Sequence, residues 1–462
     1  MAKQITCLGV LAVARWLLAI ITVCLIAELC AGASPEAAPG DWEVQLRRAS
    51  VLRPAPRPDA VTARLLADAA DGHFGSHRLI RAALIASGAE DSVLLAEFER
   101  RFDAWCADLQ RSGELRGDNP RRAKAIHDYL HARVFHGGYR DDATDLACVF
   151  QTGEFNCVSS TICFLALAGE LGVAAQAIEL PGHCLVELPS AAGVVEIETT
   201  CPQWFDVLDS PQRSRDMVLR VTGFEHRAAQ SRRRVNDVRL LGIIYYNRGV
   251  EQLARGEYRA AAESNLLAIR VDPTNQIARG NLLATLNNWA LDLSGSQRHD
   301  EALDLLDAAI TIAPDHRNFL SNEIHITQNR VEQLLAQNEW RQALRRLDHA
   351  VEKRPAEPYY LQARWSLVER QGDAFLAADR LDAATDMFDA VAKRYPHAAE
   401  PSGIEVGVWN RAALARLDRG DYSAALALLE FALHRMPDSD TLANNRAAIM
   451  ARWNRHVADR QE

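Results

Sequence analysis

The sequence has no Cys-x-x-Cys pair, only four lysines and no segment in which basic residues dominate. Because structural zinc sites usually take cysteines paired at that spacing, we expect no zinc site, and we predict no other metal or cofactor. The net charge is −9 and no basic domain stands out, which argues against nucleic acid as a partner. Cysteine is also absent after Cys201, so any thiol chemistry must lie in the first half of the chain.

The segment 1–33 has the pattern of an export signal. An apolar run covers residues 16–27, and a small-x-small sequence ends at Ala33. This pattern predicts a cleaved signal peptide and a periplasmic, cell-envelope or extracellular location. An uncleaved membrane anchor is the alternative, because residues 5–27 are long enough to span a bilayer. Residues 34–58 are rich in alanine, proline and arginine and are predicted to be a linker.

The length of 462 residues and the apolar fraction of 48% predict two or three domains with sizeable cores. We expect one domain over residues 59–210, a second linker over residues 211–239 and a helical array over residues 240–462. The second linker contains an arginine run at residues 232–234, which is typical of a solvated segment. Export would allow a disulfide among the cysteines that follow the leader, which are Cys106, Cys148, Cys157, Cys163, Cys184 and Cys201.

Cys157 is the first candidate for chemistry. It follows a short loop containing Gly153 and Asn156, and it precedes an apolar helical pattern over residues 161–171. The partial positive charge at the N-terminus of a helix favours the nucleophilic thiolate. The alternative is structural, because a cysteine before an apolar helix is often a small buried hydrophobic residue.

A predicted hairpin supplies the second and third candidates. His183 follows a Pro-Gly turn, and residues 189–192 can close a hairpin onto residues 193–199. If Leu188 pairs with Gly193, His183 lies opposite Glu198, within side-chain reach. One face of the hairpin is then a core face, formed by Cys184, Val186, Val195 and Ile197. The other is a site face, formed by His183, Glu187, Glu196 and Glu198. Glu196 therefore competes with Glu198 as the acidic member of the site.

These residues suit acyl transfer by a cysteine nucleophile. Cys157 would attack a carbonyl, His183 would act as the base, and Glu198 would orient the imidazole. The oxyanion would take hydrogen bonds from the backbone N–H of Cys157 and from the side-chain amide of Gln151. A glutamine in a loop is more often simply solvated.

The order and spacing of these residues resemble the transglutaminase-like superfamily, relatives of the papain-type cysteine proteases. The resemblance covers roughly residues 80–210 and implies an α+β fold. In that family a cysteine begins a helix, a histidine lies on a following strand, and an acid ends the next strand, commonly in Asp-Pro-Thr. Here Glu198-Thr199-Thr200 stands in place of that motif. The resemblance implies a peptide or amide substrate and a thioacyl intermediate, with Cys157, His183 and Glu198 as the catalytic residues.

The rest of the chain is repetitive. Prolines recur at one constant interval, at Pro273, Pro314, Pro355, Pro396 and Pro437. An alanine lies at a fixed distance before each proline, and a large or ring-bearing side chain lies three positions before that alanine. The pattern resembles the tetratricopeptide repeat, a helix-turn-helix unit of usually about 34 residues, with a longer period of about 41 residues here. We expect five all-α repeats in a superhelix, with the extra residues in the first helix or in the loop before it.

One position of the repeat, at a fixed distance before each proline, carries a polar residue throughout. The residues at this position are Asn247, Asn288, Asn329, Arg370 and Arg411. In tetratricopeptide repeats the corresponding position often faces the concave groove, so the resemblance implies a peptide or protein ligand there. Asparagine can bind a peptide backbone, and arginine can bind a carboxylate through two hydrogen bonds. The alternative is that these side chains are only solvated.

The sequence therefore supports two main hypotheses. The first is an exported cysteine hydrolase of the peptidase or amidase type, whose repeats bind a protein or peptide. The second is a non-catalytic adaptor, in which the repeats bind the partner and the first domain is a degenerate scaffold. Protein cross-linking by transamidation is a third hypothesis, in which an amine rather than water resolves the thioacyl intermediate.

Overall fold

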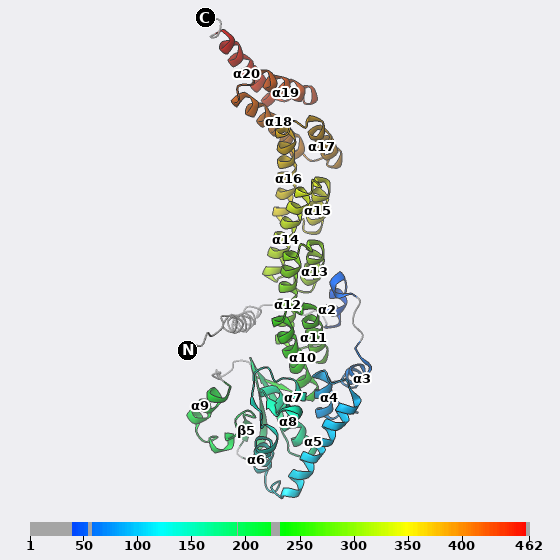
Figure 1. Cartoon of the computed structure of the whole chain (residues 1–462), viewed down its shortest axis with the longest axis vertical. Coiled ribbons are helices and arrows are strands. Elements are labelled where there is room, and N and C mark those ends of the chain that lie inside the picture. Colours follow the sequence, from blue (N-terminus) through cyan, green and yellow to red (C-terminus); the bar gives the residue numbers. More distant parts are fainter. Residues whose placement is uncertain (1–38, 54–57, 192, 223–231, 459–462) are drawn as a thin grey trace, which may run out of the picture. The chain divides into compact units, whose positions relative to one another are not determined.

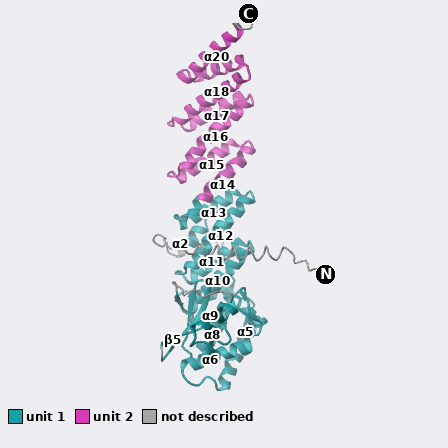
Figure 2. Cartoon of the chain, turned by 90° about the vertical axis from the view of Figure 1, so that its left-hand side faces the viewer, with its two compact units in different colours: residues 1–320 teal, residues 321–462 magenta. Residues whose placement is uncertain are grey.

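The computed structural model describes residues 39–53, 58–191, 193–222 and 232–458. The predicted leader over residues 1–33 lies outside these ranges. None of the described helices is both long and apolar enough to span a bilayer. The chain divides into two compact units, residues 1–320 and 321–462, which are described separately here (Figure 2).

The first unit begins with a short segment that packs on helical repeats. It consists of helix α2 (Pro39–Leu46) and the 3-10 turn η1 (Ser50–Leu52). Helix α2 packs against α11 (Tyr258–Val271) and α13 (His299–Ile312). Trp42 and Leu46 are buried, and Arg47 forms an ion pair with Glu263. The prediction of a linker over residues 34–58 is therefore wrong for this part, because two apolar side chains and a charge pair hold it in place.

The next part of the unit combines helices with a small sheet (Figure 1). Its helices before the sheet are α3 (Ala60–Asp68), α4 (Leu79–Ala86), α5 (Ser92–Ser112), α6 (Asn119–Tyr129) with the π-turn η2 (Leu130–Val134), α7 (Leu146–Gln151) and α8 (Cys157–Glu170). The sheet has the strand order β5-β4-β3-β6. Its strands are β3 (Gln176–Leu180), β4 (His183–Ser190), β5 (Gly193–Ile197) and β6 (Arg233–Val235), and all neighbours are antiparallel. A separate parallel pair joins β1 (Gly138–Tyr139) to β2 (Glu154–Phe155).

Helix α8 lies at the centre of this α+β part. Its residues 157–168 are all buried, as expected for a helix that is apolar on every side. Asn156 caps the N-terminus, and its side-chain oxygen accepts hydrogen bonds from the N–H groups of Val158 (2.9 Å) and Ser159 (3.1 Å). The Ser159 hydroxyl accepts in return from the backbone N–H of Asn156, which completes a capping box.

The hairpin of β4 and β5 forms in a register different from the predicted one. Ser190 pairs with Gly193 and Leu188 pairs with Val195, so each partner of β4 lies two positions away from the predicted one. The two faces of a strand alternate with a period of two, so this shift keeps every side chain on its predicted face. Ile197 is buried on the core face, and Glu196 is exposed on the other. The predicted pairing was wrong because the turn is tighter than the segment 189–192 suggested.

The described parts of the predicted linker over residues 211–239, which are residues 211–222 and 232–239, contain regular elements. They include α9 (Pro211–Thr222) and β6, which is the edge strand next to β3. Arg233 lies directly opposite Glu179 of β3 and pairs with Glu179 and Asp272. The arginine run is therefore part of the sheet at this point, and Arg233 supplies the closest positive charge to two buried carboxylates.

Helix-turn-helix pairs follow with the predicted period. In the first unit these are α10 (Asp237–Ala254) with α11, and α12 (Gln276–Gly295) with α13. Helix α14 (Arg317–Ala336) crosses the boundary between the units. The second unit continues with α15 (Trp340–Lys353), α16 (Pro358–Ala377), α17 (Leu381–Arg394), α18 (Glu400–Asp418), α19 (Tyr422–Arg435) and α20 (Asp440–Ala458). Each second helix has 14 residues and ends just before the repeat proline, so the extra length lies in the first helices.

The predicted domain boundary at residue 240 is not where the chain divides, because the α+β part and the first two repeats belong to one compact unit. Helix α10 explains why. Its buried residues include Leu241, Ile244, Tyr245 and Tyr246, which lie on all sides of the helix. Helix α10 packs on α11 and also on α4 and α8 of the α+β part. A first helix buried on both sides cannot mark a boundary.

The turn within each helix pair has a left-handed residue at its centre. These residues are Gly256, Gln297, Asn338, Asp379 and Gly420, all with φ between 52° and 80°. Since a side chain is strained there, we expect Gln297→Gly to raise the free energy of unfolding by about 0.5–1 kcal/mol. Urea denaturation monitored by circular dichroism measures this free energy. The increase should be smaller for Asn338→Gly, because asparagine tolerates the left-handed conformation. A lower midpoint for Gln297→Gly would contradict the expectation.

Candidate active site

Cys157 is the first residue of α8, and its loop is held by hydrogen bonds on both sides. The side-chain amide of Asn156 donates to the hydroxyl of Thr144 (2.7 Å) and to the carbonyl of Asp141 (3.1 Å). The side chain of Cys157 is almost completely buried. As the first helical residue, Cys157 has a backbone N–H with no partner inside the helix, which suits it to bind an oxyanion.

His183 and Glu198 form a buried pair. His183 Nε2 lies 2.6 Å from Glu198 Oε2, and the two side chains are 8% and 2% exposed. The other carboxylate oxygen accepts hydrogen bonds from the hydroxyl (2.7 Å) and backbone N–H (3.2 Å) of Thr200. Because both oxygens of Glu198 are engaged, the carboxylate is fixed in the orientation that binds the imidazole.

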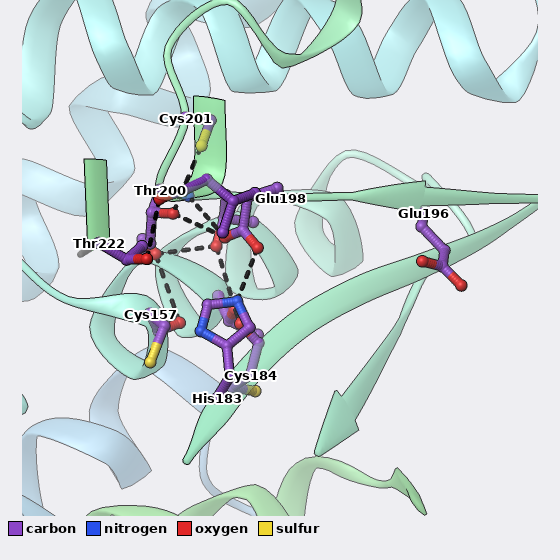
Figure 3. A network of polar contacts seen from close by, with 12 residues as sticks. Cys157, His183, Cys184, Glu196, Glu198, Thr200, Cys201 and Thr222 are labelled. Atoms are coloured by element: carbon purple, nitrogen blue, oxygen red, sulfur yellow. Dashed lines mark hydrogen bonds and ion pairs between the residues drawn. The ribbon is translucent and has the colours of Figure 1, made fainter. Parts of the chain in front are cut away.

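The imidazole of His183 lies between Glu198 and Cys157 (Figure 3). Its second ring nitrogen faces Cys157 (Figure 3). The structure thus brings together three predicted residues that are far apart in the chain. A sulfur, an imidazole and a carboxylate in this order form the arrangement that thiol acyl-transfer chemistry requires.

The electrostatics of the pair favour the imidazolium. Burial acts to lower the pKa of His183, but the negative charge of Glu198 and the hydrogen bond to it, together with the nearby Cys157, outweigh burial and raise the pKa to about 10. At neutral pH the ring therefore carries its proton. An imidazolium beside a thiol favours the thiolate, the form that attacks carbonyl carbon.

Glu196, the competing acid, is not part of this arrangement. Its side chain is exposed and forms an ion pair of 2.6 Å with Arg232. Figure 3 shows Glu196 well apart from His183 and Glu198. Gln151 is the last residue of α7 and its side chain is exposed. Its role as a donor to the oxyanion stays a prediction.

Three threonine and serine hydroxyls join the helix of Cys157 to the strand end of Glu198. Thr199 Oγ1 lies 2.8 Å from Ser160 Oγ and 3.1 Å from Thr161 Oγ1, all of them buried.

His131 donates from Nε2 to the carbonyl of Thr199 (3.1 Å). Burial lowers the pKa of His131 to about 3, with the nearby His127 adding to the effect, so His131 is neutral and can keep this role over the physiological range. Sequence reasoning missed His131, since nothing in its local pattern distinguishes it.

Tyr139 is a second residue that the sequence did not reveal. It lies on β1 and pairs in register with Phe155 of β2, just before Cys157. Burial raises the pKa of the Tyr139 phenol, and so do the nearby Cys157 and Asp141. The close approach of β1 to β2 requires Gly137, where a side chain would collide with the backbone of Thr152 and Glu154. In the sequence, the Gly137-Gly138 pair is the feature that could have indicated this close approach.

Of the remaining cysteines, Cys201 contacts this arrangement through the hydroxyl of Thr200 (3.8 Å). All six cysteines in the described ranges are free thiols, so the disulfide that export would allow does not form among them in this structure. Burial raises the pKa of Cys163 and of Cys184, which keeps both as neutral thiols. Cys106, on α5, has a pKa raised to about 11 by burial and by nearby carboxylates, chiefly Glu170.

The five polar residues at the fixed repeat position, Asn247, Asn288, Asn329, Arg370 and Arg411, are called the polar ladder here. Their side chains already contact other residues of the protein. Asn247 donates to Thr144 of the α+β part (3.3 Å). In the second unit Arg370 binds Glu332 through two hydrogen bonds (2.7 and 3.2 Å), and Arg411 binds Asp373 (2.9 Å) and Glu369 (2.8 Å). Asn288 accepts from Asn287 and Asn329 contacts His325, each at 3.3 Å. A ligand carboxylate would have to displace an internal partner from either arginine.

Comparison with known proteins adds little to this picture. No family profile matches the chain, and no curated protein matches it. Solved structures that match include YrrB, a TPR protein with an unusual peptide-binding site (17% identity, 45% of this chain, 92% of that chain, TM-score 0.14). Others are a tetratricopeptide repeat protein from Parabacteroides merdae (18%, 47%, 77%, 0.17) and the TPR domain of P58(IPK) (14%, 90%, 99%, 0.17). The chain is predominantly helical and resembles such proteins, but at these scores the likeness carries no argument about a ligand or a reaction.

Proposed function

We propose that this chain is a cysteine-dependent acyl-transfer enzyme, a hydrolase of the peptidase or amidase type. The observation that carries the proposal is the buried His183–Glu198 pair, 2.6 Å long, whose imidazole faces Cys157 at the start of α8. The resemblance of this part of the sequence to transglutaminase-like domains supports the same chemistry. Glu198 would take the role that the aspartate of Asp-Pro-Thr has in that family.

The proposed reaction has two steps. The Cys157 thiolate attacks the carbonyl carbon of an amide, and the backbone N–H of Cys157 stabilises the oxyanion. The leaving amine takes a proton from the His183 imidazolium, which leaves a thioester on Cys157. Neutral His183 then accepts a proton from water, the hydroxide attacks the thioester, and the acid departs as the thiolate and imidazolium form again. Glu198 stays ionised and holds the ring throughout.

The repeats would recruit a protein or peptide to the enzyme. Asn288 and Asn329 are the ladder positions best suited to bind a peptide backbone, since Arg370 and Arg411 have carboxylate partners. We also propose that the protein is exported, by a cleaved signal peptide or with a retained membrane anchor. This part of the proposal depends on residues 1–33 of the sequence.

Alkylation of Cys157 by iodoacetamide tests the catalytic proposal. At neutral pH an ordinary thiol is only a few per cent thiolate, so we expect Cys157 to react about tenfold faster than in a His183→Ala variant. Peptide mapping by mass spectrometry separates the cysteines, and Cys106 serves as an internal control that the substitution should not affect. Equal rates for Cys157 in the two proteins would exclude an activated thiol.

The non-catalytic adaptor is the second candidate, and the observation that favours it is the extent of the repeats, which occupy residues 237–458. An adaptor would bind a peptide while Cys157 reacts slowly and independently of His183. The cross-linking alternative predicts that a labelled primary amine becomes attached to a glutamine peptide. Release of ammonia without attachment of the amine would favour hydrolysis.

A further inference from the structure

Helix α10 of the first repeat is bound to the α+β part by three consecutive side chains. Tyr246 donates to Glu179 of β3 (3.0 Å), and Arg248 donates to the carbonyl of Ala86 at the end of α4 (2.6 Å). Between them, Asn247 donates to the hydroxyl of Thr144 (3.3 Å). Thr144 precedes α7, in the segment that leads to the loop of Cys157. The first repeat therefore reaches the candidate active site through Asn247.

The contact continues from Thr144 to the helix that bears Cys157. Thr144 Oγ1 also accepts a hydrogen bond from the side-chain amide of Asn156 (2.7 Å), and both residues are buried. With its nitrogen held in this way, Asn156 points its side-chain oxygen at the N–H groups of Val158 and Ser159. The capping of α8 thus depends on one rotamer of Asn156, which Thr144 fixes together with the carbonyl of Asp141.

We propose that Asn247 is a positioning residue for Cys157, acting through Thr144 and Asn156. The inference rests on the proposed function and assigns the first repeat helix to the catalytic unit, in place of the predicted peptide-binding role of Asn247. Without the amide of Asn247, the Thr144 oxygen loses one of its two donors and the side chain can rotate, so Asn156 keeps only the carbonyl of Asp141 as a fixed acceptor. The first turn of α8 then frays, and the thiol of Cys157 moves relative to His183.

The test compares Asn247→Leu with Asn318→Leu in the full chain. Asn318 is exposed on helix α14 and lies outside the positions proposed to bind a peptide, so its replacement makes the same change of side chain at a residue with no part in the proposal. A buried hydrogen bond typically contributes a factor of about 3 to 10 in an equilibrium, so we expect that loss in the iodoacetamide rate of Cys157 for Asn247→Leu only. Amide hydrogen exchange at Val158 and Ser159 should accelerate by a similar factor.

Thr144→Val provides a second route if Asn247→Leu does not fold. It removes the hydroxyl at nearly constant volume, and the double variant should be no slower than the slower single variant if the two residues act in series. Additive losses, or unchanged exchange at Val158 and Ser159 in Asn247→Leu, would overturn the inference. If His183→Ala reduces the rate but Asn247→Leu does not, only the inference fails. If the rate does not depend on His183, the proposed function fails, whereas the exchange measurement still decides whether Asn247 supports the cap.

Discussion

Arg233→Ala is expected to lower the free energy of unfolding of the first unit by about 3 kcal/mol, because it leaves two buried carboxylates without their main partner. Arg233 forms ion pairs with Glu179 and Asp272, whose side chains are 4% and 0% exposed. Glu179 keeps the hydroxyl of Tyr246, and Asp272 keeps the hydroxyl of Thr274. These remaining hydrogen bonds place the expected cost at the lower end of the range for a broken buried pair.

Arg234→Ala is the matched control for this prediction. Arg234 is the next residue on β6 and pairs with Glu187, but its side chain is 62% exposed. Exposed pairs contribute little, so we expect a change of about 0.5 kcal/mol or less. Guanidinium denaturation followed by tryptophan fluorescence measures both variants. Equal effects for Arg233→Ala and Arg234→Ala would mean that the buried carboxylates are neutralised in another way.

The arginine run shows what sequence patterns left undetermined. Four charged or polar residues in a row, Ser231-Arg232-Arg233-Arg234, are typical of a solvated segment. Only the partners, which lie 54 and 39 residues away in the sequence, show that Arg233 pairs with buried carboxylates of the first unit. The same holds for the segment around Trp42, since its charged partners, Glu263 and Arg279, belong to repeats much later in the chain. Long-range charge pairs leave no local pattern.

The repeats were predictable because their signal is local and repeated. The constant spacing of the prolines predicted five helix-turn-helix units, and in the structure each second helix begins at the large or ring-bearing residue of the pattern, at Tyr258, His299, Trp340, Leu381 and Tyr422. The position of Asn247 was predictable too, but not its partner. The position within a repeat predicts the surroundings of a side chain only where other repeats are its only neighbours. The α+β part covers this side of the first repeat.

Within the candidate site, the sequence predicted which residues come together, but it did not predict the register in which β4 and β5 pair. The alternation of β4 and β5 placed His183 and Glu198 on one face, and this holds in the observed register as well. The register itself was wrong by two positions, because the turn length cannot be read from Pro189-Ser190-Ala191-Ala192. Glu198 lies just beyond the end of β5, and its carboxylate still contacts His183, at 2.6 Å. Thr200, whose hydroxyl and N–H bind the Glu198 carboxylate, lies in the turn that follows β5.

We expect Glu198→Gln to lower the pKa of His183 from about 10 by about 1–3 units, because the substitution removes the nearest negative charge while burial continues to disfavour the imidazolium. The titration of the His183 ring nitrogens by heteronuclear NMR measures this shift directly. Glu196→Gln is the control, since Glu196 is exposed and pairs with Arg232. It should leave the titration of His183 unchanged.

The same pair also predicts how stability depends on pH. The pKa of His183 is 6.5 in an ordinary environment and about 10 in the folded protein, so folding takes up a proton between these values. The stabilisation by the imidazolium is complete below pH 6.5 and is lost as the pH rises through 10. The free energy of unfolding should therefore fall more steeply from pH 7 to pH 10 in the wild type than in Glu198→Gln. Parallel curves for the two proteins would show that His183 is already neutral at pH 7, and the thiolate–imidazolium pair would then have no basis.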